Sequence, residues 1–178
     1  MPGSDQSDEV SRVVSAASAS DHPVVLIDGR SGSGKTELGL AVSLELGAQI
    51  IRLDDLYPGW DGLERGSAAV ATDVLGAHRW RRWDWAASAF AEEHLVDLAL
   101  PLVIEGSGSL SRANRALATL GVWVELDAAR RKQRALARDG ELYAPHWDDW
   151  ASQEQRFYDR ERPDLLADLL VDGARILA

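Results

Sequence analysis

The segment at residues 29–36 constrains the fold of this chain more than any other part of the sequence. It reads Gly-Arg-Ser-Gly-Ser-Gly-Lys-Thr and fits the phosphate-binding pattern G-x-x-x-x-G-K-S/T. An apolar, β-branched run at residues 22–28 predicts a buried strand before it. The apolar residues of 35–46 predict a buried helix after it, with Gly47 as its stop. Strand, glycine-rich loop and helix in this order predict a site for a nucleoside triphosphate.

Each residue type in this loop has a physical use in phosphate binding. The glycines let successive backbone N–H groups point at the phosphates, and the N-terminus of the following helix adds partial positive charge. Lys35 is expected to reach the β- and γ-phosphates, and the Thr36 hydroxyl to bind Mg²⁺. The predicted cofactors are therefore ATP and Mg²⁺. The residues predicted to hold the nucleotide are Gly29, Arg30, Ser31, Gly32, Ser33, Gly34, Lys35 and Thr36.

The rest of the chain predicts one α/β domain, because 178 residues suit a single core. Further strands are expected at residues 49–53, 101–105, 122–126 and 168–172, and helices at 84–98, 111–120, 127–138 and from about 146. Asp127 is the expected N-cap of the third of these helices. Residues 1–8 are typical of a disordered leader, 9–19 of a short helix and 56–83 of a long functional loop. Strands alternating with helices predict a doubly wound, mostly parallel sheet of five strands.

Composition and charge exclude several classes of protein. Without cysteine the chain has no disulfide and no thiolate zinc site, which is typical of a cytoplasmic protein. The formal net charge of −10 repels phosphate backbones, so we expect no nucleic-acid partner. No apolar run reaches the ~18 residues of a membrane span, and the N-terminus does not resemble an export signal. An anionic ligand therefore needs a local positive site.

Acidic residues at two strand ends are candidates for the chemistry that follows nucleotide binding. Asp54 follows the second strand, at the sheet edge where open α/β proteins bind ligands, and could deprotonate a substrate hydroxyl. Asp55 is the neighbouring candidate, and a solvated loop is the alternative interpretation of both. Glu105 ends an apolar strand, where a carboxylate can hold Mg²⁺ directly or through water.

Three arginines lie at spacings of three and four residues in the helix after Asp127. Arg131, Arg134 and Arg138 therefore share one face. Arginine suits a lid over a triphosphate, because its planar fork stabilises charge spread over the phosphoryl oxygens. The alternative interpretation is a solvated helix face.

A cluster of tryptophans surrounds one further acidic residue. Trp80, Trp83 and Trp85 lie beside the predicted long loop and could stack on a ring or base, although a place in the core is the alternative. Asp84 stands between two of them. Its carboxylate could accept hydrogen bonds from vicinal sugar hydroxyls, or it could cap the following helix.

Several of these segments, in this order, resemble the uridine kinase and nicotinamide riboside kinase group of P-loop kinases. The matching segments are Ile27-Asp-Gly29 with the phosphate-binding loop, residues 51–57 (Ile-Arg-Leu-Asp-Asp-Leu-Tyr), residues 102–106 (Leu-Val-Ile-Glu-Gly), the predicted lid arginines and residues 170–173 (Leu-Val-Asp-Gly). The resemblance spans most of the chain. It implies a three-layer P-loop kinase fold over residues 21–178 with a helical lid at about 130–150, preceded by a tail and short helix at 1–20.

The resemblance also implies roles for individual residues. Asp54 matches the catalytic aspartate of the group, Asp84 its ribose-binding aspartate and Glu105 its acidic residue near Mg²⁺, while Arg134 and Arg138 match its lid arginines. Tyr57 and Arg131 join Asp54 and Asp84 as expected substrate contacts. The C-terminal helix usual in that group is not expected here, because the chain stops at Ala178.

The function predicted from these features is transfer of the γ-phosphoryl group of ATP, with Mg²⁺, to a hydroxyl of a small molecule. In this hypothesis Asp54 activates the acceptor, and Lys35, Arg134 and Arg138 stabilise the moving phosphoryl group. The expected acceptor is a nucleoside or related riboside. Two alternatives remain: a kinase for a non-nucleoside sugar or sugar acid, and a nucleotide-binding regulatory ATPase.

Overall fold

The structure is a computed structural model, and it describes residues 4–176. Its centre is a sheet of five parallel strands in the order β2-β5-β1-β6-β7. The strands are β1 (Val24–Asp28), β2 (Gln49–Arg52), β5 (Leu102–Glu105), β6 (Leu120–Glu125) and β7 (Leu169–Asp172). The predicted five-stranded α/β sheet is therefore confirmed, and every pairing within it is parallel.

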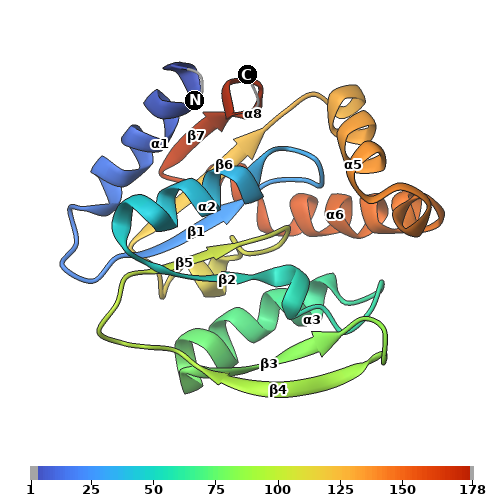
Figure 1. The fold of residues 1–178 in the computed structure, drawn as a ribbon, viewed down its shortest axis with the longest axis horizontal. Helices are drawn as coiled ribbons and strands as arrows, with labels where there is room; N and C mark the ends of the chain where they lie inside the picture. Colours follow the sequence, from blue (N-terminus) through green and yellow to red (C-terminus); the bar gives the residue numbers. More distant parts are fainter. Residues whose placement is uncertain (1–3, 177–178) are drawn as a thin grey trace.

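Helices cover both faces of this sheet (Figure 1). On one face lie α1 (Ser4–Ala17), α2 (Lys35–Leu46) and the short α8 (Gly173–Ile176). On the other lie α3 (Leu63–Ala69), the π-helix η2 (Val70–Ala77), α5 (Ala128–Tyr143) and α6 (Trp147–Glu161). The remaining short helices are η1 (Leu53–Asp55), α4 (Arg112–Arg115), η3 (Ala144–His146) and α7 (Pro163–Leu166). The result is the predicted three-layer arrangement.

The central strand β1 shows why both faces of the sheet need cover. Val25 and Ile27 pack with α1 and α2, whereas Leu26 packs with the cluster on the opposite face. Successive side chains of a strand point to opposite faces, so an uninterrupted apolar run buries both. This double burial fixes the strand, and with it the position of the loop that follows Asp28.

The phosphate-binding loop leaves the sheet at the place where the strand order reverses. After β1 the chain passes to β2 and β5 on one side of β1, and then to β6 and β7 on the other. In open parallel sheets this reversal opens a crevice at the carboxyl ends of the strands, where ligands bind. Helix α2 begins at Lys35 and ends before Gly47, whose φ is 60°, as predicted.

The prediction of a helix at residues 84–98 is wrong. The structure has instead an antiparallel hairpin of β3 (Arg79–Asp84) and β4 (Ala89–Leu95). Trp80 stacks on His94 at 4.6 Å between ring centroids, and Trp83 meets Phe90 edge-on at 5.1 Å. These cross-strand aromatic pairs outweigh the helix preference of the alanines and glutamates in the segment.

The prediction of a long loop at residues 56–83 is also wrong. Helix α3, the π-helix η2 and the first strand of the hairpin occupy most of it. Leu63, Val70 and Val74 are fully buried in the core on that side of the sheet. The segment contains four glycines, which favour a loop: Gly59, Gly62, Gly66 and Gly76. Gly66 nevertheless lies within α3, where a Cβ would come 2.5 Å from the Tyr57 ring. Close packing, and not chain flexibility, accounts for this glycine.

Three smaller expectations at the ends of elements change as well. The predicted helix at 111–120 is only one turn, because Thr119 donates from its backbone N–H to Val24 O and leads the chain into β6. Helix α1 begins at Ser4, so the expected leader at 1–8 is wrong for residues 4–8, and residues 1–3 lie outside the described part. Val10, Val13 and Ala17 fix this helix on the core. After β7 the structure describes a single helical turn, α8.

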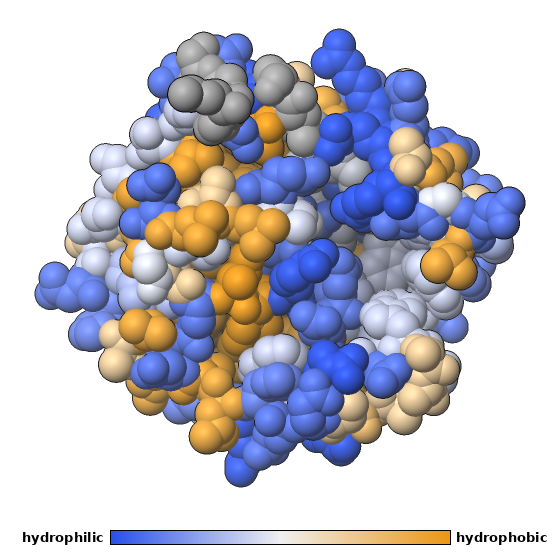
Figure 2. Space-filling model, viewed as in Figure 1, coloured by the Kyte–Doolittle hydropathy of each residue, from blue (hydrophilic) through white to orange (hydrophobic). Residues whose placement is uncertain are grey.

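The molecular surface differs in character between regions. Figure 2 shows an apolar band across the side of the molecule that carries α2, where Leu40 and Leu44 are exposed, and hydrophilic residues over α5. Within residues 4–176, no helix is both long enough and apolar enough to cross a membrane.

Candidate active site

The phosphate-binding loop turns so that several backbone N–H groups remain available. Gly32 and Gly34 have φ angles of 82° and 102°, which favour glycine over any residue with a side chain. Among the described residues, no backbone carbonyl accepts a hydrogen bond from the N–H groups of Gly32, Gly34, Lys35 and Thr36. They lie at the N-terminus of α2, where a helix leaves its first N–H groups unpaired and carries partial positive charge. The geometry suits a phosphate group.

Side chains around the loop support the same interpretation. A small cavity is lined by Gly32, Gly34, Lys35, Thr36, Glu37, Arg134, Ala135 and Arg138. It brings three cations together on a chain whose net charge is −10. The buried Ser33 hydroxyl has no hydrogen-bond partner among the described residues, but it lies against Gly29 and does not line this cavity. A bound phosphate chain fits the donors and charges of this cavity.

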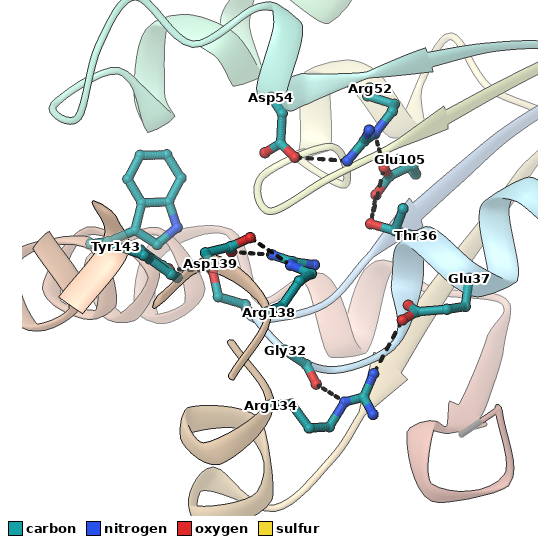
Figure 3. A network of polar contacts seen from close by, with 12 residues as sticks. Gly32, Thr36, Glu37, Arg52, Asp54, Glu105, Arg134, Arg138, Asp139 and Tyr143 are labelled. Carbon is teal, nitrogen blue, oxygen red and sulfur yellow. Dashed lines mark hydrogen bonds and ion pairs between the residues drawn. The ribbon is translucent and has the colours of Figure 1, made fainter. Parts of the chain in front are cut away.

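A continuous line of polar contacts joins the loop to Asp54. Thr36 donates from its hydroxyl to Glu105, at 3.2 Å from Oε1. Arg52 donates from Nε to Glu105 Oε1 at 3.0 Å, and from Nη2 to Asp54 Oδ2 at 3.1 Å. Figure 3 shows these four side chains in sequence, with Arg138 facing the same space from the α5 side. Arg52 therefore joins the predicted residues Thr36, Glu105 and Asp54. The sequence did not single out this arginine.

The oxygens of Thr36 and Glu105 have the chemistry that a magnesium site requires. Glu105 is only 1% exposed, and burial raises its pKa against the opposing effect of Lys35 and Arg52. A divalent cation would favour the ionised carboxylate. Mg²⁺ prefers oxygen ligands and keeps several water molecules, so two protein ligands are sufficient. These residues fit the ion predicted from the sequence.

Asp54 remains accessible at the edge of this site. It belongs to the single turn η1, and its side chain is 59% exposed. The neighbouring Asp55 is half-buried, and burial raises its pKa. Of the two candidate bases, Asp54 is therefore the more accessible to a substrate.

The three arginines of α5 have different positions. Arg134 donates from Nε to Gly32 O at 3.2 Å and from Nη2 to Glu37 at 3.1 Å. Arg138 is half-exposed and pairs with the adjacent Asp139. Both line the cavity of the phosphate-binding loop.

Arg131 does not lie where a substrate contact requires it. Its guanidinium is buried and donates to Leu126 O at 3.0 Å and to Ser31 O at 3.5 Å. A Cβ on Gly32 would come 2.2 Å from the Arg131 carbonyl oxygen. This residue supports the phosphate-binding loop from outside, so its prediction as a substrate contact is corrected.

Tyr57 and Asp84 also differ from their predicted roles in substrate binding. Tyr57 is 2% exposed, donates to Ser107 O at 2.6 Å and packs edge-on against Trp150, so it belongs to the core. Asp84 accepts from the backbone N–H of Ala86 and Ala87, both at 3.0 Å. Its carboxylate closes the hairpin turn, so the alternative prediction, a cap on a following helix, is wrong as well, because no helix follows it.

An aromatic cluster lies beside Asp54 and reaches the phosphate-binding loop through Tyr143. Trp85, at the tip of the hairpin, donates from Nε1 to Asp54 O at 2.9 Å. Trp60 packs on Trp85 at 4.9 Å and stacks on Tyr143 and His146 at 5.6 and 4.2 Å. The cluster therefore connects the hairpin, the loop after η1 and the end of α5, and forms an apolar wall next to Asp54.

Asp28 connects the start of the phosphate-binding loop to the loop after β5. It accepts from the backbone N–H of Gly29 at 2.7 Å, of Gly108 at 3.1 Å and of Leu110 at 2.9 Å. Burial raises its pKa from 3.8 to about 6, although these N–H donors and Lys35 oppose the shift. A charge at the end of a buried apolar strand needs hydrogen-bond partners. The sequence shows such a charge, because Asp28 directly follows the apolar run at 24–27.

The raised pKa of Asp28 predicts a specific pH dependence of stability. A carboxyl whose folded-state pKa is raised stabilises the fold below 3.8, and this contribution is lost as pH rises through about 6. Asp28→Asn cannot lose that proton. We expect the free-energy advantage of the wild type over Asp28→Asn to fall by about 2 kcal/mol between pH 4 and pH 7. Urea unfolding of both proteins without nucleotide measures this difference, and a constant difference would contradict the assignment.

Two further site residues could not be found from the sequence. Arg52 lies one residue before the predicted strand end, and only the pairing of β2 with β5 brings it opposite Glu105. Glu154 is 123 residues from Ser31, to which it is hydrogen-bonded. No local pattern signals such contacts, because tertiary packing alone creates them.

Comparison with known proteins supports the fold. No protein-family model matches the chain, and no curated protein sequence matches it significantly. A possible uridine kinase from Bacillus stearothermophilus superposes with a TM-score of 0.65 and 16% identity, over 93% of this chain and 98% of the other. A candidate fructose transport system kinase from Silicibacter sp. TM1040 gives 0.58 and 19%, over 90% and 98%. The chain therefore shares the α/β fold of these two proteins over nearly their whole length.

Proposed function

We propose that this protein transfers the γ-phosphoryl group of ATP to a hydroxyl of a small molecule, and that this acceptor is a nucleoside or related riboside. The observation that carries the proposal is the line of contacts from Thr36 through Glu105 and Arg52 to Asp54. It connects a phosphate-binding loop to an accessible carboxylate at the same edge of the sheet. A donor site and a base in this relation are what phosphoryl transfer to a hydroxyl requires.

The donor half of the site stabilises charge. The free N–H groups of the phosphate-binding loop and the Lys35 ammonium bind the phosphates, and Arg134 and Arg138 neutralise charge on the γ-phosphoryl oxygens. Thr36 and Glu105 would hold Mg²⁺, which supplies further charge neutralisation on the phosphate oxygens.

The acceptor half activates the hydroxyl. The acceptor oxygen forms a bond to the γ-phosphorus while the bond from that phosphorus to the bridging oxygen breaks, and ADP leaves. The hydroxyl proton passes to Asp54, held in place by Arg52. The aromatic wall of Trp60 and Trp85 excludes water on this side, and so limits hydrolysis of the nucleotide.

Two acceptor classes follow from the similar structures. The possible uridine kinase suggests a nucleoside, for which the aromatic wall offers a surface for a planar base. The candidate fructose transport system kinase suggests a sugar without a base. The carboxylate of Asp54 serves either class, because both offer a hydroxyl.

An acceptor panel tests this proposal. The purified protein is incubated with ATP and Mg²⁺ and with nucleosides, ribosides, sugars or sugar acids, and ADP release is measured above the background without acceptor. We expect at least one acceptor to stimulate release and to appear as its monophosphate by mass spectrometry. Release that no acceptor stimulates would favour the regulatory ATPase instead.

A further inference from the structure

Ser31, the third residue of the phosphate-binding loop, is held from several directions. Its backbone N–H and its hydroxyl both donate to Glu154 Oε1, each at 2.8 Å. The Tyr143 hydroxyl donates to Ser31 Oγ at 2.9 Å, and Arg131 contacts its carbonyl oxygen. No other residue of the loop is contacted by this many side chains among the described residues.

Glu154 is a buried carboxylate at the centre of this arrangement. It is 5% exposed, and the same Oε1 also accepts from Trp150 Nε1 at 3.1 Å and lies 2.8 Å from Ser107 Oγ. A buried charge is tolerated only when it is well partnered. One oxygen therefore joins α6, the phosphate-binding loop and the loop after β5.

The Ser31 contact decides which N–H groups of the loop can meet a phosphate. Because the Ser31 N–H is directed to Glu154, it is withdrawn from the ligand, and the chain turns at Gly32 with a φ of 82°. The following N–H groups, from Gly32 to Thr36 apart from that of Ser33, are left for the nucleotide. A loop fixed in this shape before binding loses less conformational freedom when the nucleotide arrives.

We infer that Glu154 is a positioning residue for nucleotide binding, acting through Ser31 to fix the phosphate-binding loop in its ligand-ready shape. The inference rests on the proposed function, since it presupposes that the loop binds a nucleotide. Glu154 itself does not contact the nucleotide. Its removal is therefore expected to weaken ATP binding more than it changes the rate of the bound complex.

Glu154→Gln tests this role, because it keeps the size of the side chain and removes its charge. All groups around Oε1 are donors, and the neutral amide oxygen of glutamine accepts weaker hydrogen bonds from them than the charged carboxylate does. We expect the Kd for a non-hydrolysable ATP analogue with Mg²⁺, and the KM for ATP, to rise on the order of 10-fold, with kcat and the acceptor KM nearly unchanged. Asp148→Asn, on the same helix at 94% exposure, is the matched control and should behave as the wild type.

Ser31→Ala provides a second route if Glu154→Gln does not fold. It removes the hydroxyl contact and keeps the N–H bond to Glu154, so it should raise the Kd for the analogue several-fold. In the double variant the two effects should not add, because both act on one contact. A folded Glu154→Gln or Ser31→Ala protein with wild-type Kd would overturn the inference. Failure of the wild type to bind the analogue would instead refute the proposed function.

Discussion

Asp54→Asn should lower kcat by about 10²- to 10⁴-fold, the range that general-base catalysis typically contributes. The amide has nearly the shape of the carboxylate and still accepts from Arg52, but it cannot take the acceptor's proton. Because Asp54 lies at the acceptor side of the polar line and makes no contact with the phosphate-binding loop in the described residues, the Kd for ATP should remain close to that of the wild type. Steady-state kinetics together with calorimetric ATP binding measure both quantities.

The neighbouring Asp55 supplies the control for this prediction. Asp55→Asn changes the same chemical group one residue later, at a half-buried position. We expect it to retain most of the activity. If Asp55→Asn lost activity while Asp54→Asn kept it, the roles of the two carboxylates would have to be exchanged. Equal losses in both variants would indicate a structural effect on the turn η1 and not proton transfer.

The phosphate-binding loop could be predicted from the sequence, because a local segment encodes it. Between residues 22 and 47 the apolar strand, the glycines and the helix stop are all properties of neighbouring residues, and the structure confirms each element. The N-cap Asp127 was predictable for the same reason. Its side chain accepts from the N–H of Arg130, which is close to it in the sequence.

The surroundings of Asp54 could not be predicted in this way. Residues 79–95 contain alanine and glutamate, which favour helix locally, yet cross-strand pairs of aromatic rings make them a hairpin. Tyr57 follows the expected motif, but the direction of its side chain depends on contacts with Trp150 and Ser107. Those partners lie 50 or more residues away, so no local pattern contains them.

The arginines of α5 show what residue spacing can predict and what it cannot. Spacing correctly places Arg131, Arg134 and Arg138 on neighbouring turns, but it does not say how deeply each is buried. The first is enclosed beneath the phosphate-binding loop, and the last is half-exposed. Gly140, with φ 55° and ψ −135°, interrupts the helix after Arg138. The first part of α5 therefore packs on the loop, and any hinge for lid movement is best sought at Gly140.

Replacing Lys35 should affect both binding and catalysis. Lys35→Met keeps an unbranched chain and removes the only ammonium group that lines the cavity of the phosphate-binding loop. Loss of one preorganised charge contact to the reacting group lowers kcat by about 10²- to 10³-fold, and we expect the Kd for ATP to rise as well. Measurement uses the same kinetic and calorimetric assays as for Asp54→Asn.

The chain offers one close control, because Lys132 is its only other lysine. It is 53% exposed on α5, so Lys132→Met makes the same chemical change away from the cavity and should retain activity. Read together, the two site variants separate the halves of the reaction. Asp54→Asn should impair turnover alone, whereas Lys35→Met should impair turnover and nucleotide binding. If Lys35→Met bound and turned over ATP like Lys132→Met, the phosphate-binding loop would not be the donor site, and the proposed phosphoryl transfer would have to be abandoned.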